Sequence, residues 1–190
     1  MKIANSERLK FELMTDQDAH LFFELDQDPE VMRYINGGNM TSMEDVLNIY
    51  IPRMKSYTNE KLGWGQWKVS ITDTNEFIGW VLVRPIDFFS DNSQLDNLEL
   101  GWRFKKITWG KGYATEAAKS IALAVSQTKS VSKISAIALE CNLASIKIMT
   151  KLGMKYIKTY IHKDPLGDIE AVYYEIKVDD FHKRTALNYN

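Results

Sequence analysis

The sequence predicts an α/β protein of mixed α+β character, with a single central β-sheet flanked by helices. Short apolar segments of strand length are interspersed with segments whose apolar residues recur every three or four positions, the spacing of an amphipathic helix. Their order is strand, helices, strands, and then alternating helices and strands. Because a sheet buries its apolar faces against helices, this order indicates a mixed sheet with helices packed on it. The 190 residues fit one domain, 1–190.

The first half of the chain is expected to hold a strand, three helices and a hairpin. The strand is expected over residues 8–14, the helices over 15–25, from 28 onward and over 41–57, and the hairpin strands over 67–72 and 77–84. Thr15 and Asp28 are good N-cap residues. Thr41 and Glu44 have the spacing of a capping box. Pro52 would make the third helix irregular, because proline lacks the amide hydrogen that a helix interior needs.

The second half is expected to alternate strands and helices after a loop over residues 86–96. The strands are expected over 97–104, 133–139, 156–162 and 171–178, and the helices over 117–127 and 142–152. The first of these helices has one apolar face, formed by Ala117, Ala118, Ile121, Ala122 and Val125. Asn142 is a favourable N-cap for the second helix, and Gly153 ends it.

The most informative segment lies between the strand 97–104 and the helix 117–127. It reads Trp109-Gly110-Lys111-Gly112-Tyr113-Ala114-Thr115-Glu116-Ala117. Glycines at such a junction let the backbone approach a ligand closely. The first amides of a helix have no intrahelical partner, and together with the helix dipole they form an anion site. The segment therefore predicts a site for a phosphate or diphosphate.

Two common phosphate-binding motifs do not fit this segment. A P-loop needs Gly-x-x-x-x-Gly-Lys followed by Ser or Thr. Gly112 follows Gly110-Lys111 here, and no glycine occupies the required upstream position. A dinucleotide fingerprint needs a third Gly or Ala, where this chain has Thr115.

The segment instead resembles the acetyl-CoA diphosphate loop of the GNAT N-acetyltransferase superfamily, with its pattern Gln/Arg-x-x-Gly-x-Gly/Ala. The pattern falls on Trp109, Gly112 and Ala114, and Trp109 departs from the usual Gln or Arg. This departure, with the following Tyr-Ala-Thr-Glu-Ala, resembles the RimJ/RimL-like branch, which includes acetyltransferases of ribosomal-protein N-termini. The resemblance is specific over about residues 98–158. It implies the GNAT fold, with acetyl-CoA as co-substrate in a cleft between splayed central strands.

The resemblance also implies which residues bind acetyl-CoA. They are Trp102, Arg103, Phe104, Trp109, Gly110, Lys111, Gly112, Tyr113, Ala114, Thr115, Asn142 and Ser145. Taken alone, Asn-x-x-Ser at a helix start indicates only capping. Asn142 and Ser145 lie one strand after the glycine loop, where GNAT enzymes contact the pantetheine arm, and they receive that role by resemblance.

Acetyl transfer to an amine needs a neutral amine, a polarised thioester carbonyl and a protonated leaving thiolate. Many GNAT enzymes protonate the thiolate with a tyrosine at the position of Met149, which cannot donate a proton. Because members of the RimJ/RimL-like branch use a serine and a glutamate, the resemblance implies Ser145 as the acid and Glu99 as the base, acting through water. The alternative for Glu99 is a strand carboxylate that pairs with a neighbour.

Composition limits the other possibilities. A net charge of −1 gives no general attraction to nucleic acid, and no apolar run reaches the length of a membrane span. The single cysteine, Cys141, rules out an internal disulfide and suits a reducing cytoplasm; we expect it to be structural. His20, His162 and His182 lack metal-ligand spacing, so no metal site is expected.

The acceptor is left open between a protein N-terminus and a small polyamine or antibiotic amine. Two acid-rich segments, 26–39 and 86–96, are expected to border its pocket and to suit a cationic amine. The resemblance favours the protein N-terminal α-amine. A non-catalytic acyl-CoA sensor is the alternative outside enzymes, and a homodimer is left open.

Overall fold

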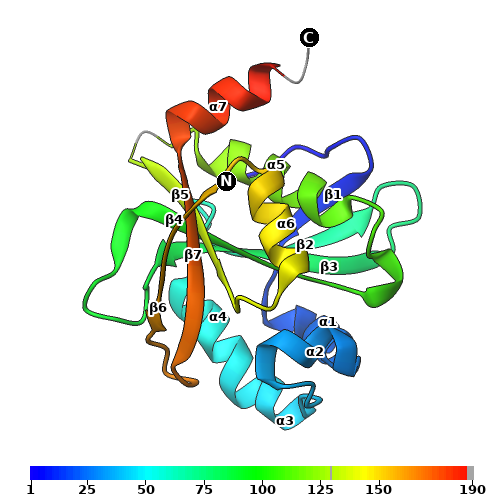
Figure 1. The fold of residues 1–190 in the computed structure, drawn as a ribbon. Helices are drawn as coiled ribbons and strands as arrows, with labels where there is room; N and C mark the ends of the chain where they lie inside the picture. Colours follow the sequence, from blue (N-terminus) through cyan, green and yellow to red (C-terminus); the bar gives the residue numbers. More distant parts are fainter. Residues whose placement is uncertain (129, 188–190) are drawn as a thin grey trace. The chain divides into compact units, whose positions relative to one another are not determined.

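The computed structural model of the chain describes residues 1–128 and 130–187. Across them, seven strands form one mixed sheet in the order β1-β2-β3-β4-β5-β7-β6, and helices flank it, which confirms the predicted fold class (Figure 1). The strands are β1 (Leu9–Leu13), β2 (Gly65–Ile71), β3 (Phe77–Ile86), β4 (Gln94–Phe104), β5 (Lys133–Ala138), β6 (Lys155–His162) and β7 (Ile169–Lys177).

The helices follow the expected order, with one addition at the C-terminal end. They are α1 (Ala19–Asp26), α2 (Pro29–Asn36), α3 (Met43–Asp45), α4 (Ile51–Tyr57), α5 (Tyr113–Val125), α6 (Leu143–Lys151) and α7 (Val178–Leu187). Short η segments lie at Asp16–Asp18, Val46–Tyr50 and Lys106–Thr108. No helix within the described residues is long and apolar enough to cross a membrane.

The contacts divide the chain into two compact units. The first unit comprises Met1–Val83 and Trp102–Ser120, and the second comprises Arg84–Gly101 and the described residues from Ile121 onward. Strands β3 and β4 and helix α5 each contribute residues to both units. The assignment of 1–190 to one domain therefore stays a prediction.

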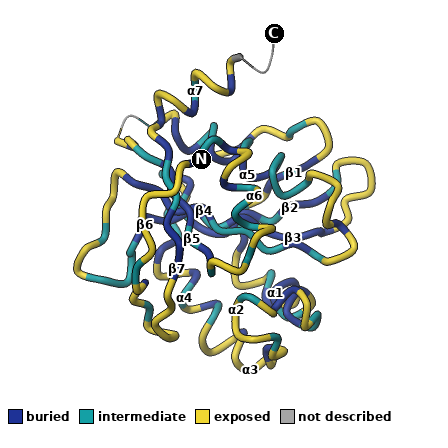
Figure 2. The backbone as a smooth tube through the Cα atoms, viewed as in Figure 1, coloured by how far each residue is buried: buried dark blue, intermediate teal, exposed yellow. Residues whose placement is uncertain are grey.

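In the first unit, β1, β2 and β3 form an antiparallel meander. Leu9 pairs with Ile71 across β1 and β2, and Gly65 pairs with Val83 across β2 and β3. The strands are largely buried, as the dark segments of the tube show (Figure 2). Gly79 on β3 allows a close approach, because a Cβ there would lie 2.3 Å from the Arg103 carbonyl oxygen. The backbone that leads into the glycine loop thus lies directly against β3.

The third predicted helix begins and continues differently from the expectation. Its N-cap is Ser42, whose hydroxyl accepts from the Asp45 amide at 3.0 Å. The predicted capping box at Thr41 and Glu44 is wrong, because the Thr41 hydroxyl instead donates to the buried Asp26 carboxylate at 2.8 Å. A π-helical segment, Val46–Tyr50, lies just before the turn that contains Pro52, which accounts for the expected irregularity.

In the second unit, β4 runs parallel to β5, while β7 pairs antiparallel with both β5 and β6. Helix α6 contacts β5, and α7 contacts β7. Helix α7 was not predicted from the sequence. Its buried residues, Val178, Phe181 and Thr185, recur at helical spacing, but the segment is strongly polar and only this narrow stripe indicates a helix.

Candidate functional site

The glycine loop joins the end of β4 to the start of α5 within the first unit. Gly110 and Gly112 have φ angles of 76° and 85°, a backbone region that favours glycine. A Cβ on Gly110 would meet nothing within 4 Å, so open space lies over the loop at this point. The α5 hydrogen bonds begin with the Glu116 amide, which donates to the Gly112 carbonyl at 3.0 Å. The first amides of a helix have no intrahelical partner, and the anion site predicted at them stays a prediction.

The tryptophan at the start of the loop folds back onto the preceding strand. The Trp109 indole Nε1 donates to the Phe104 carbonyl at 2.9 Å, while 46% of the residue stays exposed. Phe104 itself is buried, and its ring would contact a Cβ on Gly79 at 2.9 Å. Of these predicted cofactor residues, Trp109 is thus on the surface of the loop and the Phe104 ring is part of the core.

Arg103 has a structural partner that the sequence analysis missed. Its guanidinium forms an ion pair with Asp26, and the two side chains are 11% and 2% exposed. The same guanidinium lies over the Trp80 ring at 4.9 Å. Any contact of Arg103 with a cofactor would therefore come from its backbone. Asp26 was expected to border the acceptor pocket, but it is buried in this ion pair and belongs to the core of the unit.

A second ion pair connects Arg8, just before β1, with Glu116 in the first turn of α5. This pair was also not predicted from the sequence. Arg8 Nη2 lies 2.6 Å from Glu116 Oε2, and Arg8 Nη1 donates to the Lys111 carbonyl at 3.1 Å. The Arg8 guanidinium also lies 4.5 Å from the centre of the Tyr113 ring. The Ser6 hydroxyl donates to Glu116 Oε1 at 2.7 Å. The only local signal was an acidic residue in the first turn of a helix.

These contacts decide the charge state of Glu116. Burial alone would raise the pKa of its carboxyl, but hydrogen bonds from Ser6 and Arg8 and the Arg8 charge outweigh burial and hold the pKa below its ordinary value. Glu116 is therefore ionised at neutral pH, and it keeps Arg8 against the loop.

In the second unit, the residues predicted to act in catalysis lie in two places. Glu99 on β4 is buried, and its Oε2 accepts from Arg84 Nε at 2.9 Å. Asn142 caps α6 as predicted, because its Oδ1 accepts from the Ser145 amide at 3.2 Å. Met149, at the position of the missing tyrosine, is fully buried. The pairing of Glu99 with Arg84 matches the alternative reading of Glu99, and the roles of Glu99 and Ser145 in catalysis stay predictions.

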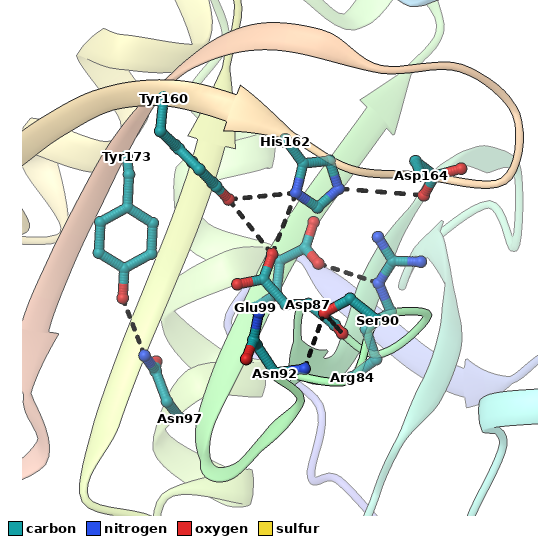
Figure 3. A network of polar contacts seen from close by, with 10 residues as sticks. All are labelled: Arg84, Asp87, Ser90, Asn92, Asn97, Glu99, Tyr160, His162, Asp164 and Tyr173. Atoms are coloured by element: carbon teal, nitrogen blue, oxygen red, sulfur yellow. Dashed lines mark hydrogen bonds and ion pairs between the residues drawn. The ribbon is translucent and has the colours of Figure 1, made fainter.

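A buried polar cluster lies near Glu99 in the same unit (Figure 3). The imidazole Nδ1 of His162 lies 3.2 Å from Asp87 Oδ1 and 3.1 Å from the Tyr160 hydroxyl. Asp87 has a φ angle of 56°, which is unusual for a residue other than glycine, so the chain holds this carboxylate at a conformational cost. From the sequence, His162 was tested only for metal-ligand spacing, and this polar cluster was not predicted. A usable signal was the two-residue spacing of Tyr160 and His162 along β6.

Two phenols in this region remain protonated at neutral pH. Burial, followed by the negative charges of Asp87 and Glu99, raises the pKa of Tyr160 far above its ordinary value. Burial also raises the pKa of Tyr173 to about 12, although the Asn97 amide that donates to its hydroxyl at 2.8 Å works in the opposite direction. Both hydroxyls can therefore donate hydrogen bonds to neighbouring carboxylates.

Among residues 1–128 and 130–187, no group of three or more His, Cys, Asp or Glu side chains could hold a metal ion. Cys141 is exposed, and its expected structural role stays a prediction. It lies in the turn after β5, where its side chain packs into no core.

A comparison with protein families matches residues 8–155 to the acetyltransferase (GNAT) domain. Among curated proteins, the uncharacterised protein YkkB of Bacillus subtilis is 30% identical over 81% of this chain and 86% of its own length. FsC-acetyl coenzyme A-N(2)-transacetylase of Aspergillus fumigatus is 25% identical over 82% of this chain. The match spans 66% of that enzyme's length, so this chain corresponds to a part of it.

Solved structures share the fold. The aminoglycoside acetyltransferase AAC(6')-Ib, in complex with coenzyme A and kanamycin, superposes with a TM-score of 0.75 at 17% identity, over 92% of this chain and 98% of its own. RimL, a ribosomal α-N-protein acetyltransferase in complex with coenzyme A, superposes with a TM-score of 0.73 at 12% identity, over 94% and 99%. At these identities the likeness concerns the fold alone.

The Glu116 ion pair predicts an acid-sensitive contribution to stability. A carboxyl whose pKa is lower in the folded chain stabilises the fold above its unfolded pKa, and this contribution is lost as the pH falls through the folded value. We expect Glu116→Gln to unfold at lower urea than the wild type at pH 7. The difference in stability between the two proteins should shrink as the pH falls below 4.5, the ordinary pKa of a glutamate carboxyl. Urea unfolding at a series of pH values measures it, and a difference that grows toward acid pH would contradict the assignment.

Proposed function

This chain belongs to the GNAT family of acetyltransferases, and we propose that it transfers the acetyl group of acetyl-CoA directly to a primary amine in a ternary complex. The observation that carries the proposal is the loop of Gly110 and Gly112 at the start of α5. Its backbone conformation, its open face over Gly110 and its place at a helix start, whose first amides lack intrahelical partners, fit a diphosphate.

In this proposal, the diphosphate of acetyl-CoA is held by the backbone of the loop. The residues are those from Trp109 to Thr115, with backbone from Trp102 to Phe104 and with Asn142 and Ser145 on the pantetheine arm. Bound acetyl-CoA supplies an activated thioester. Since the Arg103 and Phe104 side chains are engaged in the protein interior, we assign these two positions a backbone role only.

For catalysis we propose Ser145 and Glu99. The Ser145 hydroxyl would donate a hydrogen bond to the sulfur that leaves the acetyl group, because Met149 cannot. Glu99 would take the proton of the incoming ammonium through water. The buried Arg84 guanidinium fixes the Glu99 carboxylate at 2.9 Å, and a fixed carboxylate loses little entropy when it positions a water.

The acceptor class we propose is a protein N-terminal α-amine, as in the RimJ/RimL-like branch. RimL supports it only through the shared fold. The alternative is a small-molecule amine, supported in the same way by AAC(6')-Ib, whose solved complex contains kanamycin. The second acid-rich segment retains Asp87 as a half-buried acid next to Tyr160, which suits either cationic acceptor. A cytoplasmic location and a homodimer stay predictions.

Release of coenzyme A with a panel of amines tests the function. The purified chain with acetyl-CoA should release coenzyme A when it is given peptides with a free N-terminus, and less with polyamines or aminoglycosides. Mass spectrometry of the peptide should place the acetyl group on the α-amine. Binding of acetyl-CoA without release on any amine would refute transfer and leave the sensor alternative.

The loop assignment predicts a specific effect of Gly110→Ala. The added methyl meets no protein atom within 4 Å, so it would intrude only on a ligand. We expect the affinity for coenzyme A, measured by calorimetry, to fall at least tenfold, which is about 1.4 kcal/mol. Gly37→Ala is the matched control, because Gly37 has a similar φ of 78° and equally open space. If both variants lose similar stability and neither loses affinity, the diphosphate does not lie at Gly110.

Glu99→Gln keeps the side-chain shape and removes the base. Because a general base is worth roughly 10²- to 10⁴-fold in rate, we expect kcat to fall by about 10²-fold or more with the affinity for acetyl-CoA preserved. The loss should shrink at high pH, where the amine arrives neutral. Glu175→Gln is the control, because Glu175 is also ion-paired in this unit, with Lys133 at 3.1 Å. Equal rates for Glu99→Gln and wild type at every pH would remove Glu99 from the mechanism.

A further inference from the structure

We propose that Arg8 supplies the cation of the glycine loop and contacts a phosphate group of the bound coenzyme A, and that Glu116 is the residue that positions it. The proposal rests on the proposed function, since it needs acetyl-CoA at the loop. Arg8 lies just before β1, more than a hundred residues before the loop along the chain, and the fold brings it there through contacts within the first unit.

The contacts place the Arg8 guanidinium directly on the loop. Nη1 donates to the Lys111 carbonyl, between the two loop glycines, and the guanidinium faces the Tyr113 ring at the first position of α5. Nη2 would lie 3.5 Å from a Cβ on Gly112. The charge therefore lies beside the backbone that is expected to hold the diphosphate.

The guanidinium keeps donors for a ligand. Arginine has five N–H groups. Nε and Nη2 each use one on Glu116 Oε2, and Nη1 uses one on Lys111. The other two N–H groups have no partner among the described residues. The Arg8 side chain is 42% exposed, so an anion can reach them. Guanidinium and phosphate pair favourably through two parallel hydrogen bonds.

The neighbouring cation at the end of β4 is less suited to this role. Lys105 Nζ lies 2.7 Å from Glu24 Oε1 and sits over the Phe77 ring, so it faces the α1 side of the unit. Trp109, at the first position of the loop pattern, carries no charge and turns back toward Phe104. Arg8, by contrast, donates directly to the loop backbone.

Glu116 fixes the direction of the guanidinium. Its Oε1 accepts from the Ser6 hydroxyl and from the Arg8 amide at 3.0 Å, and its Oε2 accepts from Arg8 Nε at 2.7 Å. A carboxylate held by this many donors has little freedom, and the arginine bound to it is pre-organised. Pre-organisation lowers the entropy lost when a ligand binds. Glu116 thus acts through Arg8, as a positioning residue.

Calorimetric titration with coenzyme A and with 3′-dephospho-coenzyme A tests the proposal. We expect Arg8→Ala to weaken coenzyme A binding at least tenfold. A similar loss with both compounds would place Arg8 on the diphosphate, and a loss with coenzyme A alone would place it on the 3′-phosphate; both support the contact. Lys10→Ala is the matched control. It removes one charge only two residues further along the chain, on β1, where Lys10 pairs with Glu12 at 3.6 Å, and should leave the affinity unchanged within about twofold.

The salt dependence of the coenzyme A affinity distinguishes a direct contact between Arg8 and a phosphate from a purely structural role of Arg8. Because salt screens exposed charges, wild-type affinity should fall more steeply with added salt than that of Arg8→Ala. Arg8→Lys should restore part of the affinity and of the salt dependence. A folded Arg8→Ala chain that binds coenzyme A like wild type, or that loses affinity with an unchanged salt dependence, would overturn the proposal. A wild-type chain that binds no coenzyme A would instead refute the proposed function itself.

Discussion

The backbone conformation of the two loop glycines is the constraint on which the candidate site depends. Strand β4 must end and helix α5 must begin within a few residues, and the turn between them has positive φ angles at Gly110 and Gly112. A side chain at either position would strain this backbone, and at Gly110 it would also project into open space. At Gly110 and Gly112 the turn therefore has no side chain beyond a hydrogen atom, which leaves the backbone there open to an anion.

An ion pair between Arg8, just before β1, and Glu116 on α5 stabilises this turn. Loops of glycine are flexible because glycine restricts φ and ψ least. Here the Arg8 guanidinium and the Glu116 carboxylate connect residues before β1 with the first turn of α5, and the Lys111 carbonyl joins the same network. An exposed ion pair contributes little to stability on its own. Its value lies in holding one loop conformation, and the Ser6 hydroxyl adds to the number of donors that do so.

The second unit holds several buried or half-buried charged and polar side chains. Arg84 and Glu99 are 8% and 6% exposed, and His162 is buried between Asp87 and Asp164. Buried ion pairs often contribute nothing to stability relative to apolar side chains, because desolvation offsets the attraction. This concentration of partnered charge, together with the left-handed backbone at Asp87, is a combination that functional sites often have. It supports the choice of Glu99 over the exposed acids of the chain.

The sequence by itself determined the mixed sheet, the order of its elements and the position of the glycine loop. These follow from local rules: apolar periodicity, N-caps at Thr15, Asp28 and Asn142, and the need for glycine in the turn. Local signals failed where a residue's partner is distant in sequence. Thr41 has the spacing of a capping box but binds Asp26, and helix α7 shows only a narrow apolar stripe.

The tertiary structure alone decided which polar side chains meet. Arg103 lies next to the loop in sequence, yet its guanidinium forms an ion pair with the buried Asp26. Arg8 lies far from the loop in sequence, yet its guanidinium donates to the loop backbone. Tyr160 and His162 meet Asp87 only because β6 lies against the segment after β3 within the second unit. A side chain's partner depends on which segments the fold brings together. Nothing in the spacing of residues along the chain encodes a charge pair more than seventy residues apart, so these pairs could be read only from the folded chain.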